Sequence, residues 1–275
     1  MKSKNKLLSL SQIRKFHYRR QRKNFAETWY MDDWYNNPYS ALKSRYYIET
    51  SALIVFILQY TKITPNFMTL TYAFLGALSG VFLASDNNKL ILISLFLLFS
   101  KGSLDWGDGL LATLKKKKSI LGDLLDHWGG LIGIYSYLCG FGIYLYNKNN
   151  EQHFILLAIL IILIRSIDLK NYAYQLTGYK IFHNNKKIKL NKNTNRDKYG
   201  VNKYGFTSYL MSFKNFFQNF VDERARTIDF ICLLIFIDVF YFNIELLNFI
   251  YYFIFIKTLI LFCGVFYITY FKNFL

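Results

Sequence analysis

The chain has 275 residues, of which 53% are hydrophobic and 20% are aromatic, and its formal net charge at pH 7 is +17. Its apolar segments are too long and too numerous for a soluble core. The composition therefore excludes an ordinary soluble domain, argues against a nucleic-acid partner and indicates positive charge at a membrane surface.

The N-terminal segment, residues 1–37, is a basic arm that ends in aromatic residues such as Trp29 and Trp34. Cations followed by aromatic side chains are typical of a segment on an anionic leaflet, and a flexible tail explains them equally well. Residues 38–63 have a polar start and an apolar second half that is short of the ~20 residues of a span. We interpret them as an interfacial amphipathic helix that precedes a transmembrane domain, residues 64–275.

Six segments of this domain each have about the ~20 apolar residues needed to cross a bilayer. They are residues 65–85, 89–112, 120–146, 153–174, 226–242 and 245–271. The sequence therefore predicts an all-α, polytopic membrane protein with six transmembrane helices.

The connections between these segments alternate in charge. The arm, the link 115–118 and the loop 175–225 are rich in Lys and Arg, whereas the links 86–88, 147–151 and 243–245 are not. By the positive-inside rule, we expect both termini and the two basic connections to be cytoplasmic.

Three carboxylates stand near the joined ends of the second and third predicted spans. Asp105 and Asp108 share one helix face because they are three residues apart, and Asp126 lies on the next helix. A short turn can therefore aim all three at one point, where they repel each other unless a cation lies between them. Oxygen ligands suit Mg²⁺, Mn²⁺ or Ca²⁺. Salt bridges to the lysines of 115–118 are the alternative.

The run from Asp105 to Gly130 resembles the signature of the CDP-alcohol phosphotransferase family, D-x2-D-G-x2-A-R-x8-9-G-x3-D-x3-D. The segment 64–69 is similar to the P-N-x-x-T entry into that family's first span. The resemblance covers about residues 38–270. The signature matches with family spacing at Asp105, Asp108, Gly109, Ala112, Gly122 and Asp126.

The resemblance implies that 64–275 is a catalytic domain with a cytoplasmic site. It would transfer a phospho-alcohol or phosphatidyl group from a CDP-linked donor to an acceptor hydroxyl and release CMP, in phospholipid or lipid-linked glycoconjugate synthesis. A lipid would be donor or acceptor, and a homodimer is the family expectation. Asp105, Asp108 and Asp126 would hold Mg²⁺ or Mn²⁺ against the pyrophosphate. The nucleotide would be flanked by Asn66, Thr69, Gly109, Ala112 and Gly122.

Two positions depart from the signature. Thr113 stands in place of Arg and removes a cation that would neutralise phosphate, for which the lysines of 115–118 can partly compensate. Gly130 stands in place of the last Asp, which in much of the family is a metal ligand or the general base.

A substitute base is available on the same helix. Asp123 and His127 are four residues apart, which suits a carboxylate that orients an imidazole. The pair resembles the choline/ethanolamine phosphotransferase branch, whose motif reads G-E-L-F-D-H. A packing role for His127 is the alternative.

Other charged residues give weaker indications. Four cations near the cytoplasmic ends of the fourth and fifth spans are candidates for an acceptor phosphate or a lipid headgroup, with snorkelling to the interface as the alternative: Arg165, Lys170, Arg224 and Arg226. Lys101 lies one turn before Asp105 and is a candidate to pair with Asp105 or with phosphate. For Asp229 and Asp238 we expect hydrogen bonding between helices or pairing with Arg226.

Two other classes of function stay open on the sequence alone. A relative that binds CDP-alcohol or lipid without turnover would explain Thr113 and Gly130. A transporter with an acidic cation site would explain carboxylates in a membrane, but not the glycines at family spacing.

Overall fold

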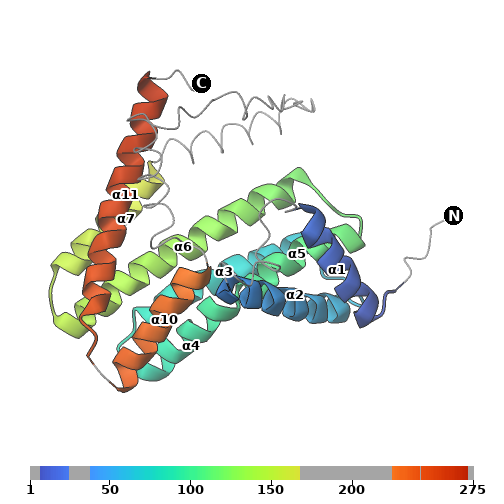
Figure 1. The fold of residues 1–275 in the computed structure, drawn as a ribbon, viewed down its shortest axis with the longest axis horizontal. Coiled ribbons are helices and arrows are strands. Elements are labelled where there is room, and N and C mark those ends of the chain that lie inside the picture. The colour runs from blue at the N-terminus through green and yellow to red at the C-terminus, as the bar shows by residue number, and fades with distance from the viewer. Residues whose placement is uncertain (1–6, 25–37, 168–224, 242, 272–275) are drawn as a thin grey trace. The chain divides into compact units, whose positions relative to one another are not determined.

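The computed structural model describes four stretches of the chain, and their regular structure is helical, with no strand among them: residues 7–24, 38–167, 225–241 and 243–271 (Figure 1). The chain divides into two compact units, which we describe separately. The first comprises residues 1–162 and 224–248, and the second comprises 163–223 and 249–275.

Four of the described helical stretches are long and apolar enough to cross a membrane: Pro65–Leu83 (α3), Asn88–Leu114 (α4 and α5), Ile120–Asn149 (α6) and Leu246–Gly264 within α11 (Leu246–Phe271). A shorter apolar helix, α7, covers His153–Ser166, and α10 covers Ala225–Phe240. The predicted all-α, polytopic membrane fold is confirmed. The number six stays a prediction, because the end of the segment 153–174 and the loop 175–225 (up to residue 224) lie outside the described residues.

The predicted second span, residues 89–112, corresponds to one of these stretches, Asn88–Leu114, and it consists of two consecutive helices. α4 covers Asn88–Ser100 and α5 covers Gly102–Leu114, with Lys101 between them. A Cβ atom at Gly102 would lie 2.5 Å from the ring of Tyr47, which belongs to α2 (Pro38–Leu58). The glycine therefore lets an aromatic ring pack at the junction just before the helix that carries Asp105.

α3 packs more extensively on α6 than any other two helices of the described chain pack on each other. A Cβ atom on Gly80 would lie 2.0 Å from the carbonyl oxygen of Ser136, and one on Gly140 would lie 2.2 Å from that of Gly80. Small residues that let helix backbones approach are the usual device for packing in lipid. This contact fixes α6 against α3.

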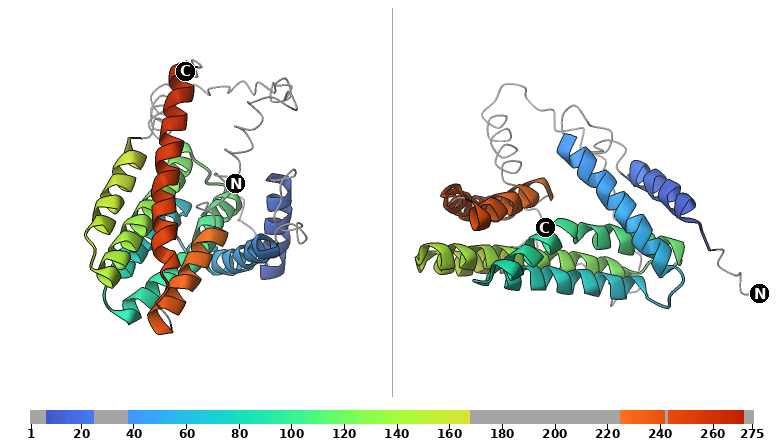
Figure 2. Two further views of the ribbon diagram at one scale, coloured as in Figure 1. Left: turned by 60° about the vertical axis from the view of Figure 1, so that its left-hand side comes forward. Right: turned by 90° about the horizontal axis from the view of Figure 1, so that it is seen from below.

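The basic arm contains a helix, α1 (Leu10–Asn24), that packs against α2 (Figure 2). The backbone N–H of Leu8 donates to the Gln59 side chain at 3.0 Å, and the Gln59 amide donates back to the Leu8 carbonyl at 2.8 Å. Residues 1–6 and 25–37 of the arm lie outside the described residues. The described part of the arm is thus docked on the protein.

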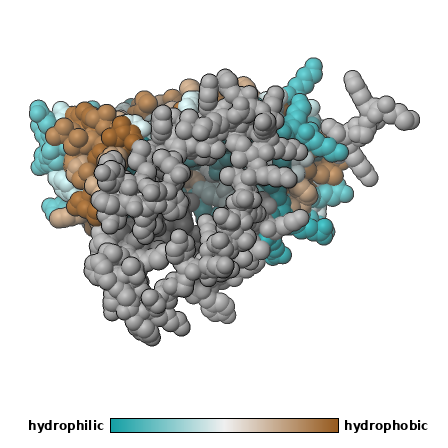
Figure 3. Space-filling model, turned by 90° about the horizontal axis from the view of Figure 1, so that it is seen from above, coloured by the Kyte–Doolittle hydropathy of each residue, from teal (hydrophilic) through white to brown (hydrophobic). Residues whose placement is uncertain are grey.

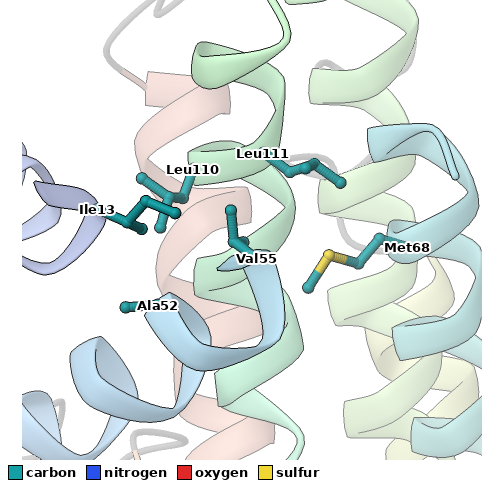
Figure 4. Packing of buried hydrophobic residues seen from close by; sticks show 6 residues of the cluster. All are labelled: Ile13, Ala52, Val55, Met68, Leu110 and Leu111. Atoms are coloured by element: carbon teal, nitrogen blue, oxygen red, sulfur yellow. The ribbon is translucent and has the colours of Figure 1, made fainter. Parts of the chain in front are cut away.

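A hydrophobic cluster joins α1, α2, α3 and α5. Ile13 of α1 is fully buried, and the side chains drawn in Figure 4 meet it or one another from the other three helices: Ala52, Val55, Met68, Leu110 and Leu111. Burial of an Ile or Leu side chain contributes about 1.5–3 kcal/mol. The cluster therefore anchors the N-terminal helix beside the helix that carries Asp105 and Asp108.

Two buried ion pairs attach α10 to the rest of the first unit. Asp229 pairs with Lys43 of α2 at 2.8 Å, and Asp238 pairs with Lys148 of α6 at 2.6 Å. Tyr39 donates a hydrogen bond to Asp229, and Tyr144 donates one to Asp238. Hydrogen bonding between helices was one of the roles expected for these aspartates, and it is observed.

Large apolar side chains remain exposed along these helices. Phe74 of α3 and Phe96 of α4 are 62% and 66% exposed. Figure 3 shows a hydrophobic patch among the coloured residues of the view. Contiguous apolar surface of this kind suits contact with lipid.

Candidate active site

Helix ends place the predicted site residues of α3, α5 and α6 together. α3 begins at Pro65, and its N-cap Thr64 accepts a hydrogen bond from the Phe67 N–H at 3.2 Å. α6 begins at Ile120, and its N-cap Ser119 accepts one from the Gly122 N–H at 3.0 Å. The short turn after α5 returns the chain directly into α6.

The three predicted carboxylates come from facing helices. The carboxyl groups of Asp105 on α5 and Asp126 on α6 are hydrogen-bonded to each other, and Asp108 lies within electrostatic range of both. Asp108 is buried, with 6% of its surface exposed, Asp105 is half-buried, and Asp126 is exposed. In the described residues no three His, Cys, Asp or Glu side chains lie close enough to hold one metal ion as they stand.

Thr69 holds Asp108. Its hydroxyl lies 2.5 Å from the Asp108 Oδ2 and 3.2 Å from the Pro65 carbonyl, and both Thr69 and Asp108 are buried. We predicted Thr69 as a nucleotide-binding residue, whereas its contact in the structure is with a carboxylate. It therefore orients an acid of the site.

The start of α3 also meets the start of α6. A Cβ atom on Gly122 would lie 3.2 Å from the Asn66 Oδ1, so these two predicted nucleotide residues are neighbours. Ala112, one turn beyond Asp108 on α5, is half-buried. Gly109 faces a residue that the signature does not include, Arg20.

The proposed acid–histidine pair lies in the first turns of α6. Asp123 is exposed and His127 is half-buried, and both act electrostatically on Asp126. Lys101, at the junction of α4 and α5, interacts favourably with Asp105. Its Nζ lies 3.0 Å from the place that a Cβ atom on Gly133 would occupy. These charged groups therefore surround the Asp105–Asp126 contact.

Tyr72 faces the position of the missing aspartate. Among the described residues, the atom nearest to a Cβ on Gly130 would be the Tyr72 hydroxyl, at 3.5 Å, which is an ordinary contact distance. Tyr72 is 6% exposed and lies within electrostatic range of all three carboxylates. The sequence analysis missed it, although it stands one helical turn after Thr69.

Two residues of α1 also reach this region, and the sequence analysis missed both. Arg20 lies over Gly109 and within electrostatic range of Asp108. His17 is fully buried, its ring 6.2 Å edge-on from that of Trp106 on α5. Burial lowers the pKa of His17 to about 4, and the charge of Arg20 acts in the same direction. The only feature of the sequence that could have indicated these two residues is the high density of cations in the N-terminal arm.

Lys115, one of the lysines expected to compensate for Thr113, is engaged elsewhere. Lys115 donates to the carbonyls of Leu58, Thr61 and Ile63 at 3.2, 2.9 and 2.7 Å, so it closes the link between α2 and α3. Arg165 ends α7 and belongs to the second unit. Lys170, Arg224 and the side chain of Arg226 lie outside the described residues.

The fold and the site together define a polytopic membrane protein with carboxylates gathered where its helices meet. A sequence model of the CDP-alcohol phosphatidyltransferase family matches residues 62–270, so the chain belongs to that family. No curated protein and no solved structure matches the chain. Members of the family are transferases of phospholipid synthesis that use a CDP-alcohol donor and an alcohol or lipid acceptor.

Proposed function

We propose that this protein transfers a phospho-alcohol or phosphatidyl group from a CDP-linked donor to an acceptor hydroxyl and releases CMP. The observation that carries the proposal is the contact between the Asp105 and Asp126 carboxyl groups. Two helices of the family's signature meet there, next to Asn66 and Gly122. Acidic residues within the spanning helices of a membrane protein are functional candidates by default.

The chemistry of the donor set fits a divalent cation. Asp105, Asp108 and Asp126 offer only oxygen ligands, which suit Mg²⁺ or Mn²⁺. Carboxylates as close as Asp105 and Asp126 repel each other when both are ionised, so a cation between them would replace their mutual hydrogen bond. When bound, the metal neutralises charge on the donor's pyrophosphate.

We assign the nucleotide to the space beside the start of α3. Asn66 offers an amide next to Gly122, whose lack of a side chain lets the starts of α3 and α6 approach closely, and Gly109 and Ala112 line α5. We assign Thr69 an indirect role, because its hydroxyl binds Asp108 rather than facing the nucleotide. Lys101, which acts electrostatically on Asp105, is the cation that we assign to the donor's phosphate here.

In the reaction, the acceptor oxygen attacks the phosphorus that carries the alcohol. The bond from this phosphorus to the bridging oxygen breaks, and CMP leaves with that oxygen. We assign the acceptor's proton to His127, with Asp123 as the residue that orients the imidazole. Their proximity to Asp126 supports this assignment.

The location of the reaction follows from charge and hydropathy. The basic connections support a cytoplasmic site and cytoplasmic termini by the positive-inside rule. The exposed apolar surface supports a donor or acceptor that arrives from the bilayer. Assembly as a homodimer belongs to the same proposal and rests on the family resemblance.

The test uses the full chain in lipid nanodiscs. Labelled CDP-alcohols are supplied with lipid acceptors, with and without Mn²⁺, and CMP release is measured. We expect metal-dependent release that is lost in Asp108→Asn. The matched control is Asp86→Asn, which changes an exposed aspartate in the link between α3 and α4. Absence of release with every donor would refute the enzyme, and retained CDP binding would then favour a non-catalytic relative.

A further inference from the structure

Position 113 supplies no cation to the site. The family signature has Arg there, and this chain has Thr113. The Thr113 hydroxyl donates back to the Gly109 carbonyl of its own helix at 2.9 Å. A donor with two phosphate groups therefore lacks, on α5, the positive charge that the signature would provide.

The lysines that follow do not fill this place. Lys115 is held by three backbone carbonyls of the α2–α3 link. Lys116, Lys117 and Lys118 are exposed in the turn before α6. A flexible, hydrated ammonium group in a turn is a poor fixed ligand for phosphate.

Arg20 brings a guanidinium group to the same stretch of α5. Its Nη2 and Nη1 lie 3.0 and 3.5 Å from the place that a Cβ atom on Gly109 would occupy. Gly109 follows Asp108, whose charge acts on Arg20. The guanidinium therefore covers the glycine that the signature places beside the metal-binding aspartate.

One donor nitrogen of Arg20 is buried without an acceptor. Nη1 has no hydrogen-bond partner among the described residues. Leaving a buried charged donor unsatisfied costs free energy, so such a group is expected to have an acceptor in the working state. An anionic oxygen of a phosphate meets this need, and Arg is suited to bind it in a bidentate manner.

The helix that carries Arg20 is firmly docked. Ile13 is buried in the hydrophobic cluster, and Arg14 pairs with Glu49 of α2 at 2.5 Å. Tyr18 donates to the same carboxylate at 3.0 Å. Arg20 is thus carried by a helix whose preceding turns are anchored on α2 and in the cluster, rather than by a loose tail.

We propose that Arg20 of the N-terminal helix binds the diphosphate of the donor in place of the arginine that Thr113 replaces. This inference deepens the proposed function and rests on it for the identity of the ligand. It assigns α1, which lies outside the matched residues 62–270, to the substrate site. The chemical class of ligand is a nucleoside diphosphate.

The test measures CDP binding and turnover in nanodiscs for three variants. Arg20→Met should weaken CDP binding and raise the KM for the donor roughly 10- to 100-fold, the loss expected for hydrogen bonds to a charged group. Arg19→Met, an exposed neighbour on α1, is the matched control and should bind CDP as the natural chain does. Adding Thr113→Arg to Arg20→Met should restore binding, which a purely structural role of Arg20 would not allow.

The outcomes separate this proposal from the proposed function. Unchanged CDP binding in Arg20→Met, with turnover intact in the natural chain, overturns the role of Arg20 and leaves the enzyme standing. CDP binding that depends on Arg20 without any turnover supports the role of Arg20 and refutes the enzyme. If the natural chain does not bind CDP, the role of Arg20 is overturned whatever the turnover.

Discussion

The hydroxyl of Thr69 lies 2.5 Å from the Oδ2 of Asp108, in a buried contact between α3 and α5. It links the P-N-x-x-T segment to the acidic signature, two motifs that are 36 residues apart at their nearest ends, Thr69 and Asp105. The contact explains why both motifs belong to one site: the first span positions an acid of the second.

The first prediction tests this contact. Thr69→Val keeps the side-chain shape and removes the donor, so Asp108 loses a hydrogen bond to a charged group, worth about 1.5–3 kcal/mol. We expect CMP release to fall roughly 10- to 100-fold and the Mn²⁺ concentration for half-maximal rate to rise. Thr71→Val is the control, because the Thr71 hydroxyl bonds only to Phe67 of its own helix at 3.0 Å. Equal activity of the two variants would contradict the prediction.

The second prediction concerns the missing aspartate. His127→Ala should lower CMP release about 10²- to 10⁴-fold if the imidazole is the general base. Gly130→Asp, added to His127→Ala, should restore part of the rate, because the new Cβ atom would make an ordinary contact of 3.5 Å with the Tyr72 hydroxyl and no closer one within the described residues. Gly130→Asn has the same size without a base and serves as control. Full activity of His127→Ala alone would exclude the base assignment.

A third prediction addresses the crossing of α3 and α6. Gly80→Ala adds a Cβ atom 2.0 Å from the Ser136 carbonyl, so the two backbones must separate. Overpacking of this kind costs about 1–3 kcal/mol. Thermal unfolding in detergent should show a lower midpoint for Gly80→Ala than for Gly264→Ala, where no atom lies within 4 Å of the new Cβ. Similar unfolding midpoints of the two variants would contradict the prediction and show that α3 and α6 can separate at little cost.

The fourth prediction is a pH dependence of α1. His17 is neutral in the docked helix at pH 7, because burial lowers its pKa to about 4 from 6.5. The undocked state binds the proton more readily, so docking is strongest above pH 6.5 and weakens by up to roughly 3 kcal/mol as pH falls towards 4. The charged groups that act on His17 are Arg20, which lowers its pKa further, and Glu49, which raises it.

Hydrogen exchange of the α1 backbone checks this dependence. The natural chain should lose protection between pH 6.5 and 4.5 relative to His17→Phe, which fills the same space beside Trp106 without a titrating group. Identical protection of the two proteins at each pH would contradict it.

Local sequence determined much of the fold. Apolar runs long enough to span a bilayer predicted α3, α6 and α11 near their observed bounds. Pro65 marked the start of α3, and the spacing of Asp105 and Asp108 put both on one face of a helix. These features depend on chain geometry and hydropathy within one or two turns, so a single sequence carries them.

Other features depended on contacts between distant segments. The junction between α4 and α5 lies where Tyr47 packs on Gly102. Tyr47 belongs to another helix, so the residues around position 101 do not indicate this contact. The helix in the basic arm was not predicted, because Ile13 and the bond between Leu8 and Gln59 stabilise it from outside. Lys115, one of the lysines of 115–118 expected to compensate for Thr113, instead binds carbonyls of the α2–α3 link.

The sequence by itself thus determined the membrane class, the family and the acids of the candidate site. These follow from hydropathy and from spacing within short segments. Only the tertiary structure decided that Thr69 holds Asp108, that Tyr72 faces Gly130 and that Arg20 covers Gly109. Each of these pairs joins two separate helices. Many residues of the chain have similar side chains, and only the packing of the helices determines which of them come into contact.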